Sequence, residues 1–206
     1  MRFLSTFFLV SLLSFCGNGH AQSFDEKVTS VSNVGMTVNN LGMIGNAFSG
    51  SYQVQDFPSC EYPRGSGIEH LFDGGLWVGA IKNGQARVST GAVDDPSGYS
   101  TGKAGFEFTA EEGAQLKERS SLEDNPNFDP EAVSHQDFVA NFTDKNQQVP
   151  GTDIPIQNHD NPLGIDVHYE TYNWNFNFAN FFVVLDFKIT NTSDQTLDSF
   201  YTGYWM

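Results

Sequence analysis

The feature that most constrains this chain is an alternation of apolar side chains along residues 181–189. Every second position there is apolar, and the positions between turn polar toward the end; the apolar positions are Phe181, Val183, Leu185, Phe187 and Ile189. Side chains that alternate with period 2 indicate a β-strand with one face in a core. Residues 165–170 alternate similarly, and a turn at 191–194 leads into a third run at 197–206. Three strands with short connections predict an antiparallel meander or part of a β-sandwich.

A β-hairpin is predicted around Asn83-Gly84, which joins two strand-like runs at 76–82 and 85–90. Asn-Gly is the strongest short-range hairpin signal, because both turn residues take positive φ. A two-residue loop pairs Ile81 with Ala86, Gly79 with Val88 and Trp77 with Thr90. That face carries the larger apolar side chains, so we expect it to point inward.

Residues 106–162 differ from the flanking strands, because they are acidic and rich in Pro, Asn and Asp. Thr109-Ala110-Glu111-Glu112 matches the start of a capping box. Asp129-Pro130-Glu131 places a cap before a proline at the first helical position, leading into 132–142. We therefore expect helix only within about 106–145. The predicted fold is mainly β: an antiparallel β-sandwich-like domain with a short helical and loop insertion.

The first 21 residues have the pattern of a signal peptide. Arg2 provides the positive start, residues 3–15 form a short apolar core, and Gly19 and Ala21 place small residues before a cleavage site. The apolar run is shorter than a membrane-spanning helix requires. A lipid anchor on Cys16 is the alternative, but the bulky residue before it fits a lipobox poorly. We expect residues 22–206 to be secreted or at the cell surface, with no membrane span.

The charge balance bears on the partners of the chain. Ten Lys and Arg stand against 25 Asp and Glu, a formal net charge of -15. Proteins that bind nucleic acid neutralise phosphates with clustered basic residues, so this balance argues against a nucleic-acid partner. Aromatic residues make up 14% of the chain, enough to argue against disorder.

Asp166, His168 and Glu170 share one face of a predicted strand, with His159-Asp160 shortly upstream. Such residues can bind a metal or move a proton. Alternation already requires polar residues on a solvent face, however, and no His-Glu-x-x-His spacing is present. We interpret these residues as the solvent face of a half-buried strand.

Cys60 is the single cysteine left after leader cleavage, so it is a buried thiol or the partner of a cysteine in another chain. As a nucleophile it would need His70 or His135 as a base. Nothing around it indicates a helix N-terminus that would lower its pKa, so a structural thiol is the better interpretation. Ser66 lies in Gly-Ser-Gly, which lacks the full nucleophile elbow and is read as a turn.

Two acidic loops offer oxygen ligands, Asp94-Asp95 and the run from Asp124 to Asp129. Oxygen-rich loops in exported proteins can hold Ca²⁺, but the second run lacks the glycine and terminal Glu of an EF-hand loop. Calcium is therefore a weak candidate. We assign no catalytic, cofactor-binding or metal residue from the sequence.

Two segments resemble a known architecture. Residues 62–81 read YPRGSGIEHLFDGGLWVGAI, and residues 183–205 carry ITNTS near their centre. Both resemble the N-terminal region of large exported bacterial surface proteins, which commonly end in a type IX secretion sorting domain. The resemblance implies an N-terminal β-module whose sorting domain would lie beyond Met206. These motifs carry no catalytic residues.

We expect a non-catalytic structural or adhesion-type module of a large secreted or cell-surface protein. Its partners would be a cell-surface or extracellular polymer and downstream domains of the same protein. The alternative is an accessory domain of an exported protease or glycosidase, whose active site lies downstream or includes the Asp166, His168 and Glu170 face. The apolar alternation also leads us to expect further strands beyond Met206, and low solubility or marginal stability for residues 22–206 alone.

Overall fold

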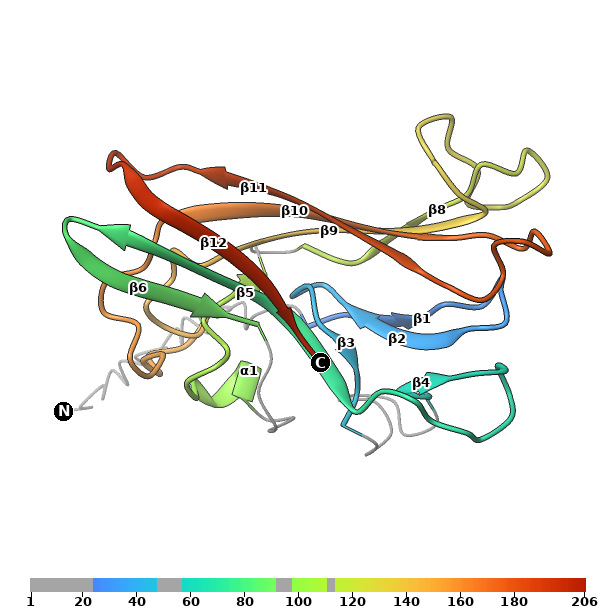
Figure 1. Ribbon diagram of the computed structural model, residues 1–206, viewed down its shortest axis with the longest axis horizontal. Coiled ribbons are helices and arrows are strands. Elements are labelled where there is room, and N and C mark those ends of the chain that lie inside the picture. Colours follow the sequence, from blue (N-terminus) through green and yellow to red (C-terminus); the bar gives the residue numbers. More distant parts are fainter. Residues whose placement is uncertain (1–23, 48–56, 92–97, 111–113) are drawn as a thin grey trace, which may run out of the picture.

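The chain folds into two antiparallel β-sheets that pack against each other as a sandwich (Figure 1). The computed structural model describes residues 24–47, 57–91, 98–110 and 114–206. Its elements are β1 (Glu26–Val28), β2 (Gly35–Asn39), β3 (Ile44–Gly45), β4 (Cys60–Glu61), β5 (Asp73–Lys82), β6 (Gln85–Thr90), α1 (Gly98–Thr101), β7 (Thr109–Ala110), β8 (Lys117–Arg119), β9 (Gln136–Thr143), β10 (Ile165–Asn173), β11 (Val184–Asn191) and β12 (Leu197–Trp205). The predicted antiparallel, sandwich-like fold is confirmed.

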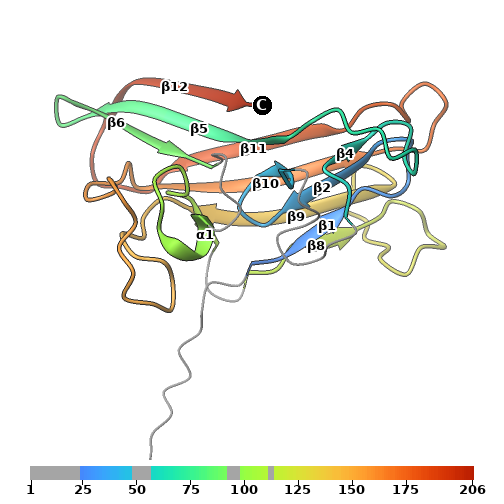
Figure 2. The ribbon, with the colours of Figure 1, turned by 90° about the horizontal axis from the view of Figure 1, so that it is seen from below.

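The described residues divide between a seven-stranded and a five-stranded sheet. The first has the order β1-β2-β3-β5-β12, with β4 beside β2 and β6 beside β5. The second has the order β11-β10-β9-β7, with β8 beside β9. β11 and β12 follow each other in the chain but belong to different sheets (Figure 2). The C-terminal strands therefore form part of a sandwich, and the alternative of a simple meander is wrong.

The β5–β6 hairpin forms as its turn residues require. Asn83 has a φ of 52° and Gly84 a φ of 74°, the left-handed conformations of a two-residue turn. The strands pair in the predicted register, with Trp77 opposite Thr90 and Ile81 opposite Ala86.

The predicted inward face of this hairpin is wrong. Leu76, Val78 and Ala80 are buried, and they belong to the opposite face of β5. Trp77 is 39% exposed and Val88 58% exposed. Both faces of β5 are apolar, so alternation cannot select one. A buried contact between the two sheets marks the inward face. Ser89 pairs with Val78, and its hydroxyl donates to the buried Asp144 carboxylate at 2.7 Å.

The predicted strands at 165–170 and 197–206 are β10 and β12. β10 alternates strictly between buried and half-buried residues and pairs with β9 and β11 along its length. The expected face of the 181–189 run is half-buried in β11, where Leu185, Phe187 and Ile189 pack against the core. Phe181 lies before the strand and is 53% exposed. Whether strands beyond Met206 cover this face stays a prediction.

The predicted helical insertion is wrong, since no helix lies among described residues 106–110 and 114–145. Residues 136–143 form β9, in which Phe138, Ala140 and Phe142 alternate with period 2 and pair with β10. The Asp129 cap is real but holds only a turn: its Oδ1 accepts from the Glu131 amide at 3.0 Å. The first predicted helix begins at Thr109, which instead forms β7; Glu111 and Glu112 lie outside the described residues.

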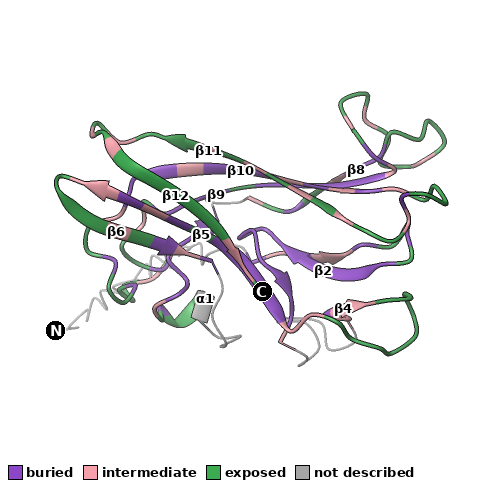
Figure 3. Cartoon of the chain, viewed as in Figure 1, coloured by how far each residue is buried: buried purple, intermediate pink, exposed green. Residues whose placement is uncertain are grey.

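The core lies between the two sheets. Its largest fully buried side chains, Tyr169, Phe138 and Phe142, belong to the five-stranded sheet, and Phe108 directly precedes β7 of the same sheet. The seven-stranded sheet contributes the fully buried Val38 and Val78. Phe108 and Phe142 meet edge-to-face at 5.2 Å, a favourable aromatic geometry. Figure 3 shows β2, β9 and β10 mostly buried, whereas β11 and β12 are mostly half-buried or exposed. The side of the sandwich formed by β11 and β12 is thus less covered than the rest.

Candidate functional site

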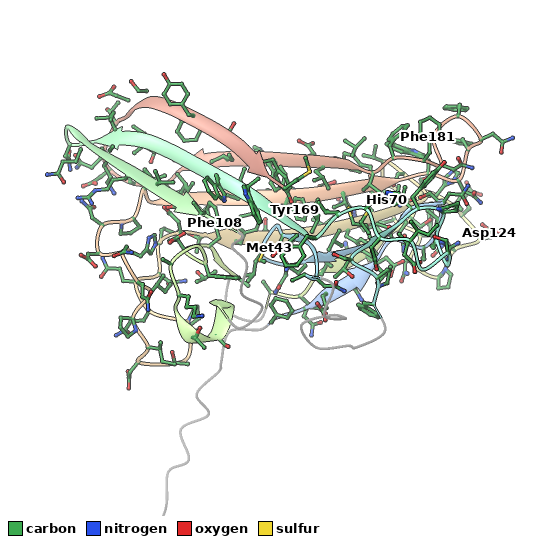
Figure 4. The ribbon with its side chains drawn as sticks, turned by 60° about the horizontal axis from the view of Figure 1, so that its bottom comes forward. Met43, His70, Phe108, Asp124, Tyr169 and Phe181 are labelled. Carbon is green, nitrogen blue, oxygen red and sulfur yellow. The ribbon has the colours of Figure 1, made fainter. Side chains whose placement is uncertain are left out.

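The most exposed aromatic surface lies on the connection between β10 and β11, residues 174–182, here called the aromatic loop. Four of its phenylalanines are solvent-exposed: Phe176 is 45%, Phe178 76%, Phe181 53% and Phe182 39% exposed. Scattered exposed apolar residues need no explanation, but a contiguous group marks an interaction surface. Figure 4 places Phe181 at one end of the sandwich, away from the core residues Met43 and Phe108.

The rings of the aromatic loop are ordered against one another. Phe176 and Phe178 stack with centroids 5.3 Å apart and planes 8° apart. Phe181 and Phe182 meet edge-to-face at 5.4 Å, and Trp174 lies 6.3 Å from Phe182. The loop therefore presents a flat stacked pair beside a second cluster.

Hydrogen bonds hold the backbone of the aromatic loop. The Asn33 amide, from the turn between β1 and β2, donates to the Asn180 carbonyl at 2.8 Å. The Asn175 amide donates to His135 Nδ1 at 3.1 Å, and the His135 ring packs on Phe176 at 4.6 Å. Both sheets thus anchor the loop, so its rings are held in place before any ligand arrives.

This loop was not predicted to be a functional site, although the sequence contains a signal for it. Trp174, Phe176 and Phe178 alternate with asparagines in the run Asn-Trp-Asn-Phe-Asn-Phe. Alternation usually indicates a strand, but asparagine disfavours strands and favours turns. An aromatic run made of poor strand residues is therefore a candidate for an exposed recognition loop.

The Asp166, His168 and Glu170 face lies on β10, as predicted, and its polar atoms are engaged by neighbouring strands. His168 Nδ1 lies 2.8 Å from Asn141 Oδ1, and its Nε2 lies 2.8 Å from Glu170 Oε1. Lys145 donates to Asp166 Oδ2 at 2.9 Å. Burial raises the pKa of Asp166, but hydrogen bonds from Lys145 and Thr143 outweigh it, so this pKa lies below its ordinary value.

Arg119 extends this network from β8. Its guanidinium contacts Glu170 Oε2 at 2.7 Å and Asp137 Oδ2 at 3.5 Å, and the side chain is only 9% exposed. The Asp137 carboxylate also accepts from the Val133 and Ser134 amides at 2.7 and 2.8 Å. These contacts join β8, β9 and β10, so the network's visible role is to hold the outer face of the five-stranded sheet.

Cys60 is a free thiol on β4, and neither predicted base pairs with it. His70 Nε2 lies 2.9 Å from the Tyr62 carbonyl oxygen, and His135 packs on the aromatic loop. Burial, with a smaller contribution from the Glu69 charge, raises the pKa of the Cys60 thiol to about 11. A reactive cysteine needs the opposite shift, so this environment favours an inert thiol.

The remaining candidates lie apart from one another. Ser66 Oγ accepts from the Ile68 amide at 3.1 Å, as expected for a turn. Asp129 pairs with Lys117 at 2.9 Å, and the described residues contain no group of three or more His, Cys, Asp or Glu side chains able to hold a metal. Asp94-Asp95, Cys16 and the leader lie outside the described residues.

His159 and Asp160 line a hollow of about 680 Å³ formed by the 145–160 loop. His159 is buried, with Nε2 2.5 Å from the Asp144 carbonyl oxygen, whereas Asp160 is exposed. His159 therefore faces the interior and Asp160 the solvent. Neither is among the hydrogen-bond partners of Asp166, His168 and Glu170 given above.

Within the described part of the chain, no helix is long and apolar enough to cross a membrane. No protein-family model matches the chain, and neither a curated protein nor a solved structure matches it.

Proposed function

We propose that this chain is a non-catalytic, adhesion-type β-module of an exported cell-surface protein, and that the aromatic loop is its contact surface. The observation that carries the proposal is the group of four exposed phenylalanines on one anchored loop at the end of the sandwich. Sandwich scaffolds commonly present binding residues on loops that a rigid framework positions.

The size of the exposed surface supports binding. A buried phenylalanine covers roughly 150–250 Å², so the four partly exposed rings leave on the order of 400 Å² of apolar surface in water. That matches the largest patch on a typical monomer, which is often functional. Leaving such a patch exposed has a free-energy cost that a partner would recover.

The chemistry of the loop favours an extended polymer with both apolar and hydroxyl or amide groups. The stacked faces of Phe176 and Phe178 offer flat apolar contact, and the exposed Asn175 and Asn177 provide donors and acceptors beside them. A cell-surface or extracellular polymer fits this mixture. Export is supported by the leader pattern at residues 1–21 and by the resemblance to large exported surface proteins.

The test compares binding of the chain and two variants to immobilised cellulose, chitin and peptidoglycan. Phe178→Ala should lower the bound fraction by at least about tenfold on the surface that the chain prefers. Val88→Ala is the matched control, because Val88 is 58% exposed on β6 but lies outside the aromatic loop. Equal binding of all three proteins, or no binding to any surface, would show that the loop is not the contact surface proposed here.

A further inference from the structure

A second surface opens between the two C-terminal strands, and one end of it reaches Phe181 and Phe182 of the aromatic loop. β11 ends and β12 begins at the turn that joins them, and the two strands diverge with distance from that turn (Figure 1). Between them lies a hollow of about 560 Å³, which we call the open seam. Its main lining side chains are Leu76, Leu185, Phe187, Ile189, Tyr204 and Met206.

The open seam continues into a second hollow of about 290 Å³, which shares Leu185 and Met206 with the first. Val34, Met36 and Ile44 from the opposite sheet form its base. Neither hollow has a charged lining residue. The two together make a continuous apolar channel along one side of the sandwich.

The floor of the open seam is rigid. Phe187 stacks on the fully buried Tyr169, with centroids 4.6 Å apart, and lies 5.6 Å from the Tyr204 ring of the other sheet. The Tyr204 hydroxyl donates to the Gly42 carbonyl at 3.1 Å. An occupant would therefore meet a preformed surface and would not have to order it first.

Both walls of the open seam are strand edges. Among the described residues β11 pairs only with β10, and β12 pairs only with β5. The β12 edge is interrupted by a register shift between Asp198 and Tyr201, where Ser199 takes a φ of 48°. Such bulges protect an edge from pairing. β11 keeps unbroken register from Val184 to Asn191, so it offers a regular row of backbone donors and acceptors.

We propose that the free edge of β11 accepts an extended strand of another polypeptide, which lies over the open seam and adds a strand to the five-stranded sheet. Alternate side chains of that strand would be apolar and would enter the channel beside Leu185, Phe187 and Ile189. Its remaining side chains would be basic. The two walls carry the carboxylates of Asp186 and Asp198, and the turn between them adds Asp194, against the single ammonium of Lys188.

A polypeptide fits this surface better than a sugar or an acyl chain, because only a strand uses the backbone row of β11 and the apolar channel together. A second copy of this chain fits less well. Each copy carries a net charge of -15, and like charges oppose association. The chemistry therefore points to a basic, alternately apolar segment of a different protein.

The probe is a peptide of about eight residues with blocked ends, in which Val and Lys alternate. Titration into the purified chain should give saturable binding, and hydrogen exchange should show new protection in β11. The same peptide with methylated backbone nitrogens keeps its charges and side chains but cannot form the strand ladder. It should bind at least about tenfold more weakly.

A pair of variants tests the channel. Tyr204 packs inward, so Thr202 on the same face points toward the open seam and Gly203 points away from it. Thr202→Lys should weaken peptide binding by at least about tenfold, through charge and bulk. Gly203→Lys adds the same charge on the other face, where a Cβ meets nothing within 4 Å, and should change binding by less than about threefold.

The proposal is overturned if the methylated peptide binds as tightly as the parent, because the attraction is then charge and apolar contact alone. Equal effects of the two lysine variants overturn it too. So does occupation of β11 by a second copy, seen as concentration-dependent dimerisation, or by the strands expected beyond Met206. Phe178 lines neither hollow, so Phe178→Ala should leave peptide binding unchanged. Failure of the aromatic-loop proposal and failure of the strand-addition proposal can therefore be distinguished.

Discussion

Replacement of Asp144 by alanine should destabilise this protein more than loss of most buried side chains. Asp144 follows β9 and is fully buried, and its carboxylate accepts four hydrogen bonds. Oδ2 accepts from Ser89 Oγ at 2.7 Å and the Leu163 amide at 2.8 Å. Oδ1 accepts from the Gly164 amide at 3.0 Å and the Ile165 amide at 2.8 Å.

The magnitude follows from those four donors. A hydrogen bond to a charged group contributes about 1.5–3 kcal/mol, and a buried donor left without a partner costs about 1–3 kcal/mol. Allowing for relaxation and non-additivity, Asp144→Ala should lower the free energy of unfolding by about 4 kcal/mol. Asp144→Asn keeps one acceptor oxygen and should cost about 2 kcal/mol. Since domains of this kind are stable by only about 5–15 kcal/mol, the alanine variant should be close to unfolding.

Chemical denaturation in urea, followed by tryptophan fluorescence, measures these differences. Asp160→Ala is the matched control, because the Asp160 carboxylate is exposed and its loss should change stability by less than about 0.5 kcal/mol. If Asp144→Ala costs less than about 1 kcal/mol, the four hydrogen bonds to this buried carboxylate contribute far less to stability than their geometry implies.

Three further predictions concern other parts of the chain. Tyr169 is fully buried, and its hydroxyl has no hydrogen-bond partner among the described residues. Tyr169→Phe should therefore leave the free energy of unfolding unchanged, or raise it by up to about 1 kcal/mol, in the same urea assay. A loss of more than about 1 kcal/mol would show that the hydroxyl has a partner. The pKa of Cys60 rises from 9.0 to about 11 on folding, so the native thiol should react with iodoacetamide at pH 8 about a hundredfold more slowly than in urea. Because the Cys60 thiol holds its proton more tightly in the folded state than in the unfolded state, the free energy of unfolding should also fall as the pH rises from 9.0 to about 11. Finally, the mature secreted protein should begin at Gln22; N-terminal sequencing that starts at Met1, or a lipid on Cys16, would contradict the predicted leader.

Several elements could be predicted because their cause is local. Asn83-Gly84 sets the hairpin and its register, since the required positive φ values depend only on those two residues. The alternation at 165–170 predicts β10 and its polar outer face, where Asp166, His168 and Glu170 lie.

Local sequence signals could not predict the structure where the same residues are compatible with two different conformations. The Asp129 cap begins a helix as readily as a turn, and the eight pairs between β9 and β10 decide for a strand in residues 136–143. Propensity is a weak preference that such tertiary pairing overrides. The aromatic loop was likewise visible as composition, but only the contacts to Asn33 and His135 show that its rings are held at the surface.

The period-2 alternation and the Asn-Gly turn predict a mainly β, antiparallel chain whose strands have one apolar face, and its residue counts show that it is acidic. The buried face of β5 depends on tertiary packing, because both faces are apolar and the contacts of Leu76 and Val78 with the core, together with the Ser89–Asp144 hydrogen bond, lie between elements far apart in the chain. Tertiary packing also decided that β11 and β12 belong to different sheets. Alternation sets which side chains share a face of a strand. Which element covers that face depends on long-range packing, and here the packing leaves the apolar channel between β11 and β12 open.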